Sequence, residues 1–188
     1  MYRKTQNRPG GGRFEAETIR RNINLSVDRC PDSETLSDRG YDMETVGSML
    51  RHKGCEIFWL APEATVYEAV AMMADKGVGA LLVISEGKLT GIVSERDYAR
   101  KVILKGKHSH EMQVKEIMTS PVFTVSPSHS VEDCMRVITA HRVRHLPVMD
   151  GDTLTGVISI GDVVRSIIAA QAHAIDQLSG YIEGRYPA

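Results

Sequence analysis

The sequence of 188 residues lacks an excess of charge, a long apolar run and a cysteine pattern. Its 23 Lys and Arg residues nearly balance 24 Asp and Glu residues, so the net charge of -1 gives no support for a nucleic-acid partner. The longest apolar stretch, at about 78–84, contains a glycine and is too short to span a membrane. Three cysteines, odd in number and unpatterned, indicate a reducing cytoplasm, and Cys134 is expected as a buried thiol.

The residue patterns of common catalytic sites are also missing. No Ser or Cys nucleophile stands with a suitable His and acid, and there is neither a P-loop nor a Gly-x-Gly-x-x-Gly fingerprint. His141 and His145 are four residues apart, but Pro147 and a strand pattern place them outside one helix. We therefore expect neither catalysis nor a metal site.

Residues 1–43 differ in composition from the rest of the chain. Arg, Asn, Asp, Ser and Gly dominate and no apolar face persists, which predicts a flexible N-terminal extension. The arginine-rich start resembles a transit peptide, but Glu15, Glu17, Asp28 and Asp32 argue against one. An overlong start or a partner-binding tail is the preferred interpretation.

One short stretch occurs twice and organises the remainder. Residues 91–97, Gly-Ile-Val-Ser-Glu-Arg-Asp, return at 156–162 as Gly-Val-Ile-Ser-Ile-Gly-Asp. The same shift of 65 residues (127 − 62) carries Pro62 to Pro127 with no gap in between. Upstream the shift becomes 68 (118 − 50), which pairs Leu50 with Met118. The sequence is therefore an internal duplication of one supersecondary unit.

Each copy is predicted as strand–helix–strand–strand–helix. Apolar periodicity, Ser or Thr caps and Gly turns mark the boundaries. A short helix at 44–51, matched near 114–118, precedes each copy, and the final helix is expected from Gly161 to about Ile182. In the first copy we expect a strand at 57–60, a helix opened by Thr65, a strand at 80–84 and a strand ending at Ser94. In the second copy we expect a strand at 122–125, a helix opened by Ser130, a strand at 145–149 and a strand ending at Ser159.

Both copies of the repeated stretch end in Ser-x-x-Asp, a pattern with two interpretations. A serine followed by an acid three residues later is typical of a helix N-cap, and Ser130-x-x-Asp133 is expected to be only that. The same arrangement leaves backbone N–H groups free for an anion and offers a carboxylate to hydroxyl groups. The duplication favours a binding site at Ser94/Asp97 and Ser159/Asp162.

The order of elements and the twin Gly-h-h-Ser-x-x-Asp, where h is apolar, resemble the cystathionine β-synthase (CBS) domain, here as a tandem pair or Bateman module. Phrases such as 94–102 and 144–148 are similar to stand-alone bacterial proteins with two CBS units. The resemblance implies a mixed α/β (α+β) fold. Two units, at 44–106 and 107–188, would be related by a pseudo-twofold axis, with their sheets face to face and their helices outside. It also implies binding of AMP or ATP, or of NAD(H) or S-adenosylmethionine in some members.

Two half-shared clefts follow from the resemblance. We call the one with Ser94 and Asp97 the first cleft and the one with Ser159 and Asp162 the second cleft. In each, the aspartate would take the ribose hydroxyls, and an apolar slot would hold the adenine. The first cleft would add Arg96 near the phosphate and Ser126, Val131, Val143 and Arg144 around the base. The second would add Ala61, Val66, Val78, Gly79 and Ala80 around the base, with Arg144 and His145 toward the phosphate.

The two copies differ where the ligand would lie. Glu95-Arg96 of the first copy corresponds to Ile160-Gly161 in the second, and Gly79-Ala80 corresponds to Arg144-His145. Two sites of unequal affinity or with different ligands are therefore expected. Arg100 and Lys101 are expected on a solvated face.

The leading hypothesis is a ligand-sensing regulatory module that acts on an unidentified protein and forms a homodimer, with no nucleic acid or membrane involved. An interaction module with vestigial clefts is the main alternative, and an enzyme acting on the bound nucleotide is a weaker one.

Overall fold

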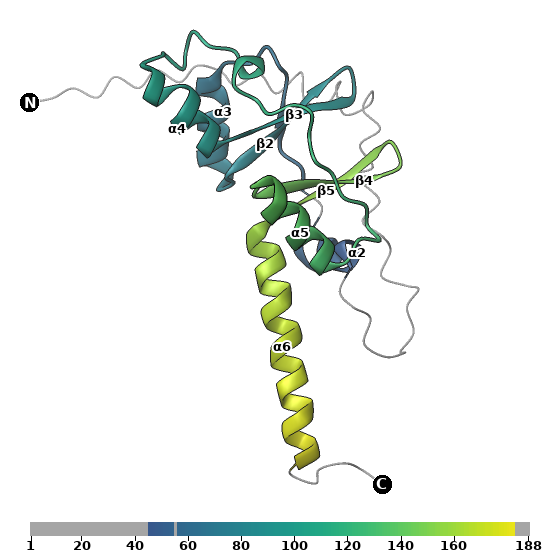
Figure 1. Ribbon diagram of the computed structural model, residues 1–188. Helices are drawn as coiled ribbons and strands as arrows, with labels where there is room; N and C mark the ends of the chain where they lie inside the picture. The colour runs from purple at the N-terminus through teal and green to yellow at the C-terminus, as the bar shows by residue number, and fades with distance from the viewer. Residues whose placement is uncertain (1–44, 55, 183–188) are drawn as a thin grey trace, which may run out of the picture.

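The computed structural model describes residues 45–54 and 56–182, and Figure 1 shows their arrangement. The predicted N-terminal extension, Cys30 and Cys55 lie outside the described residues. The elements in chain order are α2 (Val46–Lys53), β1 (Trp59–Leu60), α3 (Val66–Lys76), β2 (Ala80–Ser85), β3 (Lys88–Ser94), α4 (Glu95–Lys101), η1 (Ile103–Lys105), η2 (Val114–Glu116), α5 (Val131–His141), β4 (His145–Asp150), β5 (Thr153–Ser159) and α6 (Ile160–Ile182).

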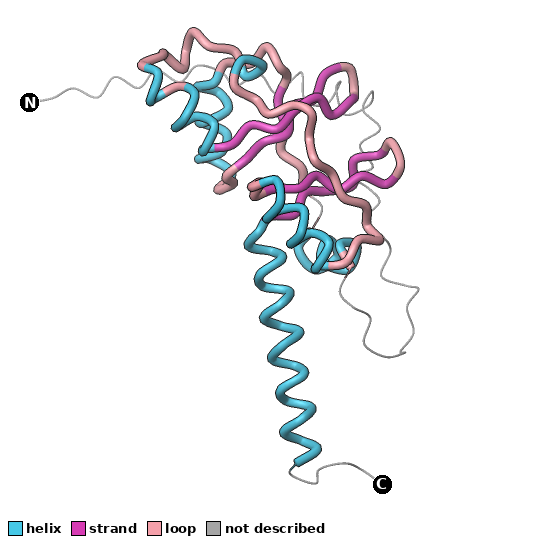
Figure 2. The backbone as a smooth tube through the Cα atoms, viewed as in Figure 1, coloured by secondary structure: helices cyan, strands magenta, loops and turns pink. Residues whose placement is uncertain are grey.

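The duplication is visible in the strand register. β2 pairs antiparallel with β3 from Ala80 opposite Ser94, and β4 pairs with β5 from His145 opposite Ser159. Both hairpins slip register at matching places, between Val83 and Ile84 in the first and between Val148 and Met149 in the second. Figure 2 shows the two strand pairs, in magenta, as separate sheets. The predicted internal repeat is confirmed in three dimensions.

One apolar layer lies between the two sheets, and a further apolar layer lies on the outer face of each sheet, under its helices. Leu82 and Ile84 of β2 meet Leu154 of β5 between the sheets, with Trp59 and Met149 packed against them. The alternate residues of each strand point the other way, because successive side chains of a strand face opposite sides. They pack under α3 and α4 in the first unit and under α5 and α6 in the second. The predicted mixed α/β fold, with facing sheets and outer helices, is confirmed.

The segment before each unit packs on the other unit. Val46, Met49 and Leu50 of α2 lie in the core of the second unit, beside Leu146 and Ile158. Conversely, Val114 and Ile117, from the chain that leads into the second unit, lie in the core of the first. The two units therefore exchange their leading segments, and neither core is complete without chain from the other half.

Two glycines of the repeated stretch make this exchange possible. A Cβ added to Gly156 would lie 2.7 Å from Leu50 Cδ2, and one added to Gly91 would lie 2.5 Å from Met118 Sδ. The shift of 65 carries Gly91 to Gly156, and the shift of 68 carries Leu50 to Met118. The pseudo-twofold symmetry therefore extends to individual contacts. In both copies the glycine is required by close approach rather than by backbone conformation.

Two expected elements of the second unit are shorter than predicted. The strand expected at 122–125 is reduced to a single parallel bridge between Val125 and Val148. In the first unit Leu82 N–H donates to Phe58 O at 3.1 Å, but the matching residue of the second unit is Pro147, which has no N–H to offer. The helix expected near 114–118 is only the 3₁₀ turn η2, and the first strand is limited to Trp59–Leu60.

Several local predictions are confirmed. Thr65–Glu68 and Ser130–Asp133 form capping boxes at the starts of α3 and α5. Cys134 is a buried free thiol, and burial raises its pKa to about 11, so it stays protonated at neutral pH. α6 begins one residue earlier than expected and ends at Ile182 as expected. Among the described residues, no helix is both long and apolar enough to cross a membrane.

The exchange predicts unequal costs for adding one methyl group to each glycine. In Gly156→Ala the new methyl group would clash with two methyl carbons of Leu50, which is fully buried and has no room to move. The variant should lower the free energy of unfolding by about 1–3 kcal/mol. Gly91→Ala meets the flexible, partly buried Met118, which can turn aside, and should cost less than about 1 kcal/mol. Urea unfolding of both variants measures the difference. An equal or reversed order would contradict the packing described for Leu50.

Candidate functional site

A pocket of about 750 Å³ opens where the two units meet. Its walls come from the start of α4 in one unit and from the segment that joins α5 to β4 in the other. Seven of the residues predicted for the two clefts line it: Gly79, Ser94, Arg96, Asp97, Val143, Arg144 and His145. A cavity therefore lies at the place expected for the first cleft, although the resemblance assigned Gly79 and His145 to the second cleft. Ser126 and Val131 are not among its lining residues.

Ser94 and Asp97 form a reciprocal cap on α4 at the edge of this pocket. Asp97 Oδ2 accepts from Ser94 Oγ at 2.6 Å and from Ser94 N–H at 3.1 Å, while Ser94 Oγ accepts from Asp97 N–H at 3.3 Å. Asp97 Oδ1 pairs with Lys101 Nζ at 2.8 Å, and Lys101 also donates to Ile117 O at 2.6 Å. The helix-capping interpretation is thus realised, but the same carboxylate also lines the cavity.

The start of α4 offers fewer free donors than predicted. Glu95 N–H donates to Gly79 O at 3.2 Å, and Asp97 N–H is used by Ser94. The expectation of free backbone donors for an anion is therefore wrong for these two groups. Recognition of a phosphate would fall instead to side chains.

Arginines from both units supply positive charge around the pocket. Arg96 and Arg100 come from α4, and Arg142 and Arg144 come from the segment after α5. Arg96 Nη1 donates to Arg142 O at 3.0 Å, which joins the two units across the cavity. Arg100 is exposed, as expected for a solvated face, and it also lines the pocket, whereas Lys101 is partly buried and pairs with Asp97. Guanidinium groups suit phosphate oxygens because they donate in a planar fork.

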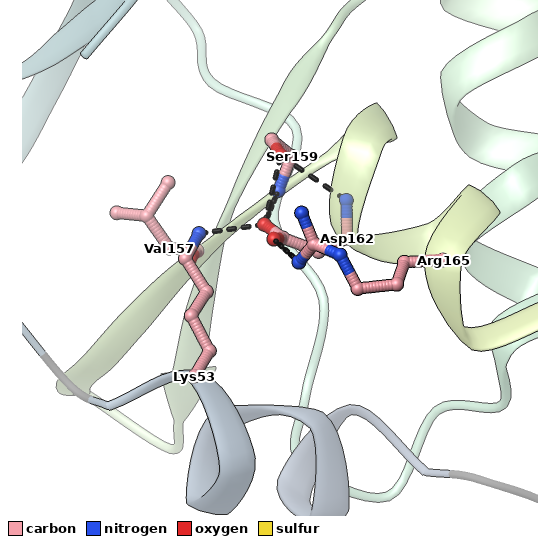
Figure 3. Close-up of polar contacts among 5 residues, drawn as sticks. All are labelled: Lys53, Val157, Ser159, Asp162 and Arg165. Atoms are coloured by element: carbon pink, nitrogen blue, oxygen red, sulfur yellow. Dashed lines mark hydrogen bonds and ion pairs between the residues drawn. The ribbon is translucent and has the colours of Figure 1, made fainter. Parts of the chain in front are cut away.

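The second cleft has its acid bound to a lysine from α2. Figure 3 shows Lys53 reaching across from α2 to the start of α6. Lys53 Nζ lies 2.6 Å from Asp162 Oδ2 and donates to Val157 O at 3.1 Å. The same Oδ2 accepts from Ser159 N–H and Oγ, both at 2.8 Å, and Arg165 Nη1 lies 3.4 Å from Oδ1. The side chain of Asp162 is only 11% exposed, whereas that of Lys53 is 39% exposed.

The protonation states follow from these contacts. Burial alone raises the pKa of Asp162, but the hydrogen bonds from Lys53 and Ser159 outweigh it and hold the pKa below the ordinary 3.8. For His145, burial lowers the pKa, the Lys53 cation lowers it further, and the Asp162 carboxylate opposes this only in part. His145 is therefore neutral at pH 7 and can hydrogen-bond a ligand without adding charge.

The remaining predicted residues of the second cleft lie apart from this pocket. Val66, at the first turn of α3, is fully buried in the core of the first unit, and Val131 has the same place in the second. Val78 packs at the edge of the first core, Ala61 is exposed and Ala80 begins β2. Ser159 and Asp162 do not line the 750 Å³ pocket. The assignment of these residues to a ligand stays a prediction.

Lys53 and Arg142 were missed by sequence reasoning. Arg142 adopts a left-handed φ of 54° as the C-cap of α5, and the only signal for it was its place beside Arg144. Lys53 contacts a residue 109 positions away, and its segment is the one part of the first copy without a counterpart in the second. Neither periodicity nor the repeat could have placed it.

Comparison with known proteins gives a consistent result. The profile of the CBS domain matches twice, at residues 46–103 and 114–169. The chain is 36% identical over 160 residues to the mitochondrial CBS domain-containing protein CBSX3 of Arabidopsis thaliana, covering 80% of this chain and 78% of that one. A solved CBS-domain protein from Burkholderia ambifaria MC40-6 is 49% identical, with a TM-score of 0.65, and the match covers 68% of this chain and 96% of that one.

A more distant solved structure contains ligands. The CBS domain pair of protein MJ0100, in complex with 5'-methylthioadenosine and S-adenosyl-L-methionine, has a TM-score of 0.56 over 61% of this chain and 90% of that one. At 22% identity it shows likeness of fold alone. None of these three proteins is named as an enzyme.

The contacts of Asp162 predict a measurable titration. Because its folded pKa lies below 3.8, the carboxylate contributes stability that is present above that value and is lost as pH falls through the lower folded pKa. Lys53→Met removes one cause of the shift and should raise the pKa of Asp162, as followed by carboxyl carbon NMR. Lys101→Met, which removes the lysine of the other acid, serves as the control. An Asp162 pKa unchanged by Lys53→Met would contradict the role given to Lys53.

Proposed function

Because the chain belongs to the CBS domain family, we propose that it is a regulatory module that binds an adenine nucleotide between its two units. The ligand is AMP or ATP, or NAD(H), and binding favours one arrangement of the units over another. The observation that carries the proposal is the 750 Å³ pocket built from both halves, with Ser94 and Asp97 on one side and Arg142 and Arg144 on the other. Its volume suits a small-molecule site.

The chemistry of the first cleft divides between sugar and phosphate. Asp97 is acceptor-only when ionised, and a ribose diol supplies two hydroxyl donors. The arginines of both units would hold the phosphates, so a nucleotide should bind more tightly than adenosine. A ligand held by both units at once stabilises only arrangements that bring these groups together, and this differential affinity is what makes a shift in arrangement possible.

The wider proposal includes partners and location. The protein would be a cytoplasmic homodimer that signals to another protein and performs no reaction itself, with no nucleic acid or membrane involved. A thermal-shift screen with AMP, ADP, ATP, NAD, NADH and S-adenosylmethionine tests the sensor role, and mass spectrometry of the recovered nucleotide tests the absence of turnover.

An interaction module with vestigial clefts is the second candidate, and α6 favours it. This helix exposes Ile175 and Leu178 at 64% and 65%, although apolar residues of this size are usually buried. No thermal shift with any of the six compounds would favour this candidate over the sensor.

Asp97→Ala should weaken nucleotide binding by about 10- to 100-fold, because it removes a charged acceptor of the ribose hydroxyls. Isothermal titration calorimetry with the ligand found by the screen measures the effect. Asp133→Ala is the matched control, since Asp133 forms the same capping box on α5 and does not line the pocket. Equal binding by the Asp97→Ala variant and the control would show that Asp97 acts only as a cap.

The second cleft should bind more weakly than the first, because Ser159 and Asp162 do not line the 750 Å³ pocket and the carboxylate of Asp162 is contacted by both Lys53 and Arg165. Lys53→Met should therefore raise affinity at the second cleft, seen by calorimetry as a stoichiometry that moves toward two ligands per chain. Arg165→Met is the control, since Arg165 also contacts Asp162 but is 77% exposed and approaches only to 3.4 Å. A loss of binding in Lys53→Met would instead make Lys53 a ligand contact.

A further inference from the structure

The helices that close the two units differ greatly in length. α4 has 7 residues and is followed by the short turn η1, whereas α6 has 23. The first turns of α6 pack on the second core through Val163 and Ile167. Its second half projects away from the rest of the protein in Figure 1, and every residue from 171 to 179 is exposed. A projecting helix of this length is marginal in water unless one face is covered.

One face of the projecting helix repeats apolar residues at alternating intervals of four and three. Val164, Ile168, Ile175 and Leu178 are 40%, 60%, 64% and 65% exposed. With Gln171 they form a continuous row at positions 164, 168, 171, 175 and 178, which we call the α6 seam. Alternation of four and three is the heptad spacing of a coiled coil, narrower than the face that a helix buries against a globular core.

The seam has room for a neighbouring helix. At about 100° per residue, the seam lies roughly a quarter turn around α6 from the side that packs on the core. The four apolar side chains would form a patch on the order of a few hundred Å², the size that marks protein contacts. A second helix can therefore lie along the seam without displacing α5 or β5.

The composition of the seam selects a second copy of this chain in parallel orientation. With Ile168 and Ile175 at the a positions and Leu178 at a d position, the row has the pattern that favours parallel two-stranded coils. In parallel register Gln171 meets Gln171 of the second copy, and the two amides can bond each other. In antiparallel register Gln171 would face an isoleucine and lose that partner.

The flanks of the seam are compatible with this pairing. Ala172, Ala174 and Ser179 stand beside it, so two identical helices meet no like charges along the projecting half. Asp176 falls on the outer side of such a pair.

We propose that α6 joins two copies of the chain as a parallel two-stranded coil along Val164, Ile168, Gln171, Ile175 and Leu178. This inference rests on the homodimer in the proposed function and identifies the surface that forms it.

The test is sedimentation equilibrium of the full chain with Ile175→Lys. The dissociation constant of the dimer should rise at least about 100-fold over wild type, because the variant places a charged side chain in the apolar contact on each of the two helices. Gln177→Lys is the matched control, because it adds the same charge to the same exposed turn on the opposite side. It should leave the dissociation constant within about twofold of wild type.

Orientation is tested separately with Leu178→Cys, at one end of the seam, in a Cys30→Ser, Cys55→Ser background. Oxidation should link two chains through this single position, because a parallel pair brings the two residues 178 together whereas an antiparallel pair places residue 178 beside residue 164 of the second copy. A dimer that fails to cross-link, while still weakened by Ile175→Lys, overturns the parallel arrangement.

The remaining outcomes separate this inference from the proposal beneath it. A wild-type dimer unaffected by Ile175→Lys overturns the seam and leaves the homodimer standing on another surface. A wild-type chain that stays monomeric at about 100 μM overturns both, since a coil too weak at that concentration would be no functional dimer. The thermal-shift screen measures nucleotide binding separately, so its result does not depend on the sedimentation or cross-linking experiments.

Discussion

The close approach of a leading segment to a strand glycine is the constraint on which this structure depends. Leu50 fills the space over Gly156, and Met118 fills the space over Gly91. Each contact places chain from one unit in the core of the other, so the two halves cannot separate without exposing both cores. The pocket lies at the junction that these contacts fix. The exchange holds the two units together, so a ligand that contacts both does not have to assemble them.

The two aspartates cap their helices in a way that would still allow a ligand to be bound. An ionised carboxylate has about four lone-pair sites. Asp97 uses Oδ2 for both donors of Ser94 and uses Oδ1 for Lys101, so Oδ1 can accept a further hydroxyl without loss of the cap. Asp162 Oδ2 already receives Ser159 twice and Lys53 once, and its Oδ1 is approached by Arg165 at 3.4 Å. The cap fixes the direction of each carboxylate, and in both aspartates Oδ1 keeps accepting capacity for a further donor.

The duplicated pattern was sufficient to predict most of the fold, because every element of one copy constrained its twin. The order of strands and helices, the caps of α3 and α5, the buried Cys134 and the length of α6 are all local or repeated features. The loss of the strand at 122–125 was in principle predictable, since Pro147 removes the donor that Leu82 provides in the first unit. The Lys53–Asp162 pair was not predictable, because it joins residues 109 positions apart and Lys53 has no counterpart in the second copy. The exchange of leading segments was not predictable either, because the sequence marks both segments as apolar but does not say which core each one enters.

The differences between the two units place the arginine-lined cleft next to the part of the second unit that carries α6. Arg96 has no cationic counterpart, because Gly161 stands at the matching position. Arg165, the counterpart of Arg100, contacts Asp162 and does not line the pocket, so the arginines around the cavity belong to the first cleft. The opposite wall of that cleft is the segment from Arg142 to His145, which leads from α5 into β4. α5 in turn packs against the first turns of α6 within the second core. A ligand in the proposed first cleft would therefore contact the segment that leads from α5 into β4, and α5 packs directly on the first turns of α6. Because packed side chains shift together rather than deform, the base of the long helix is the part of the second unit that a ligand-induced shift would reach first.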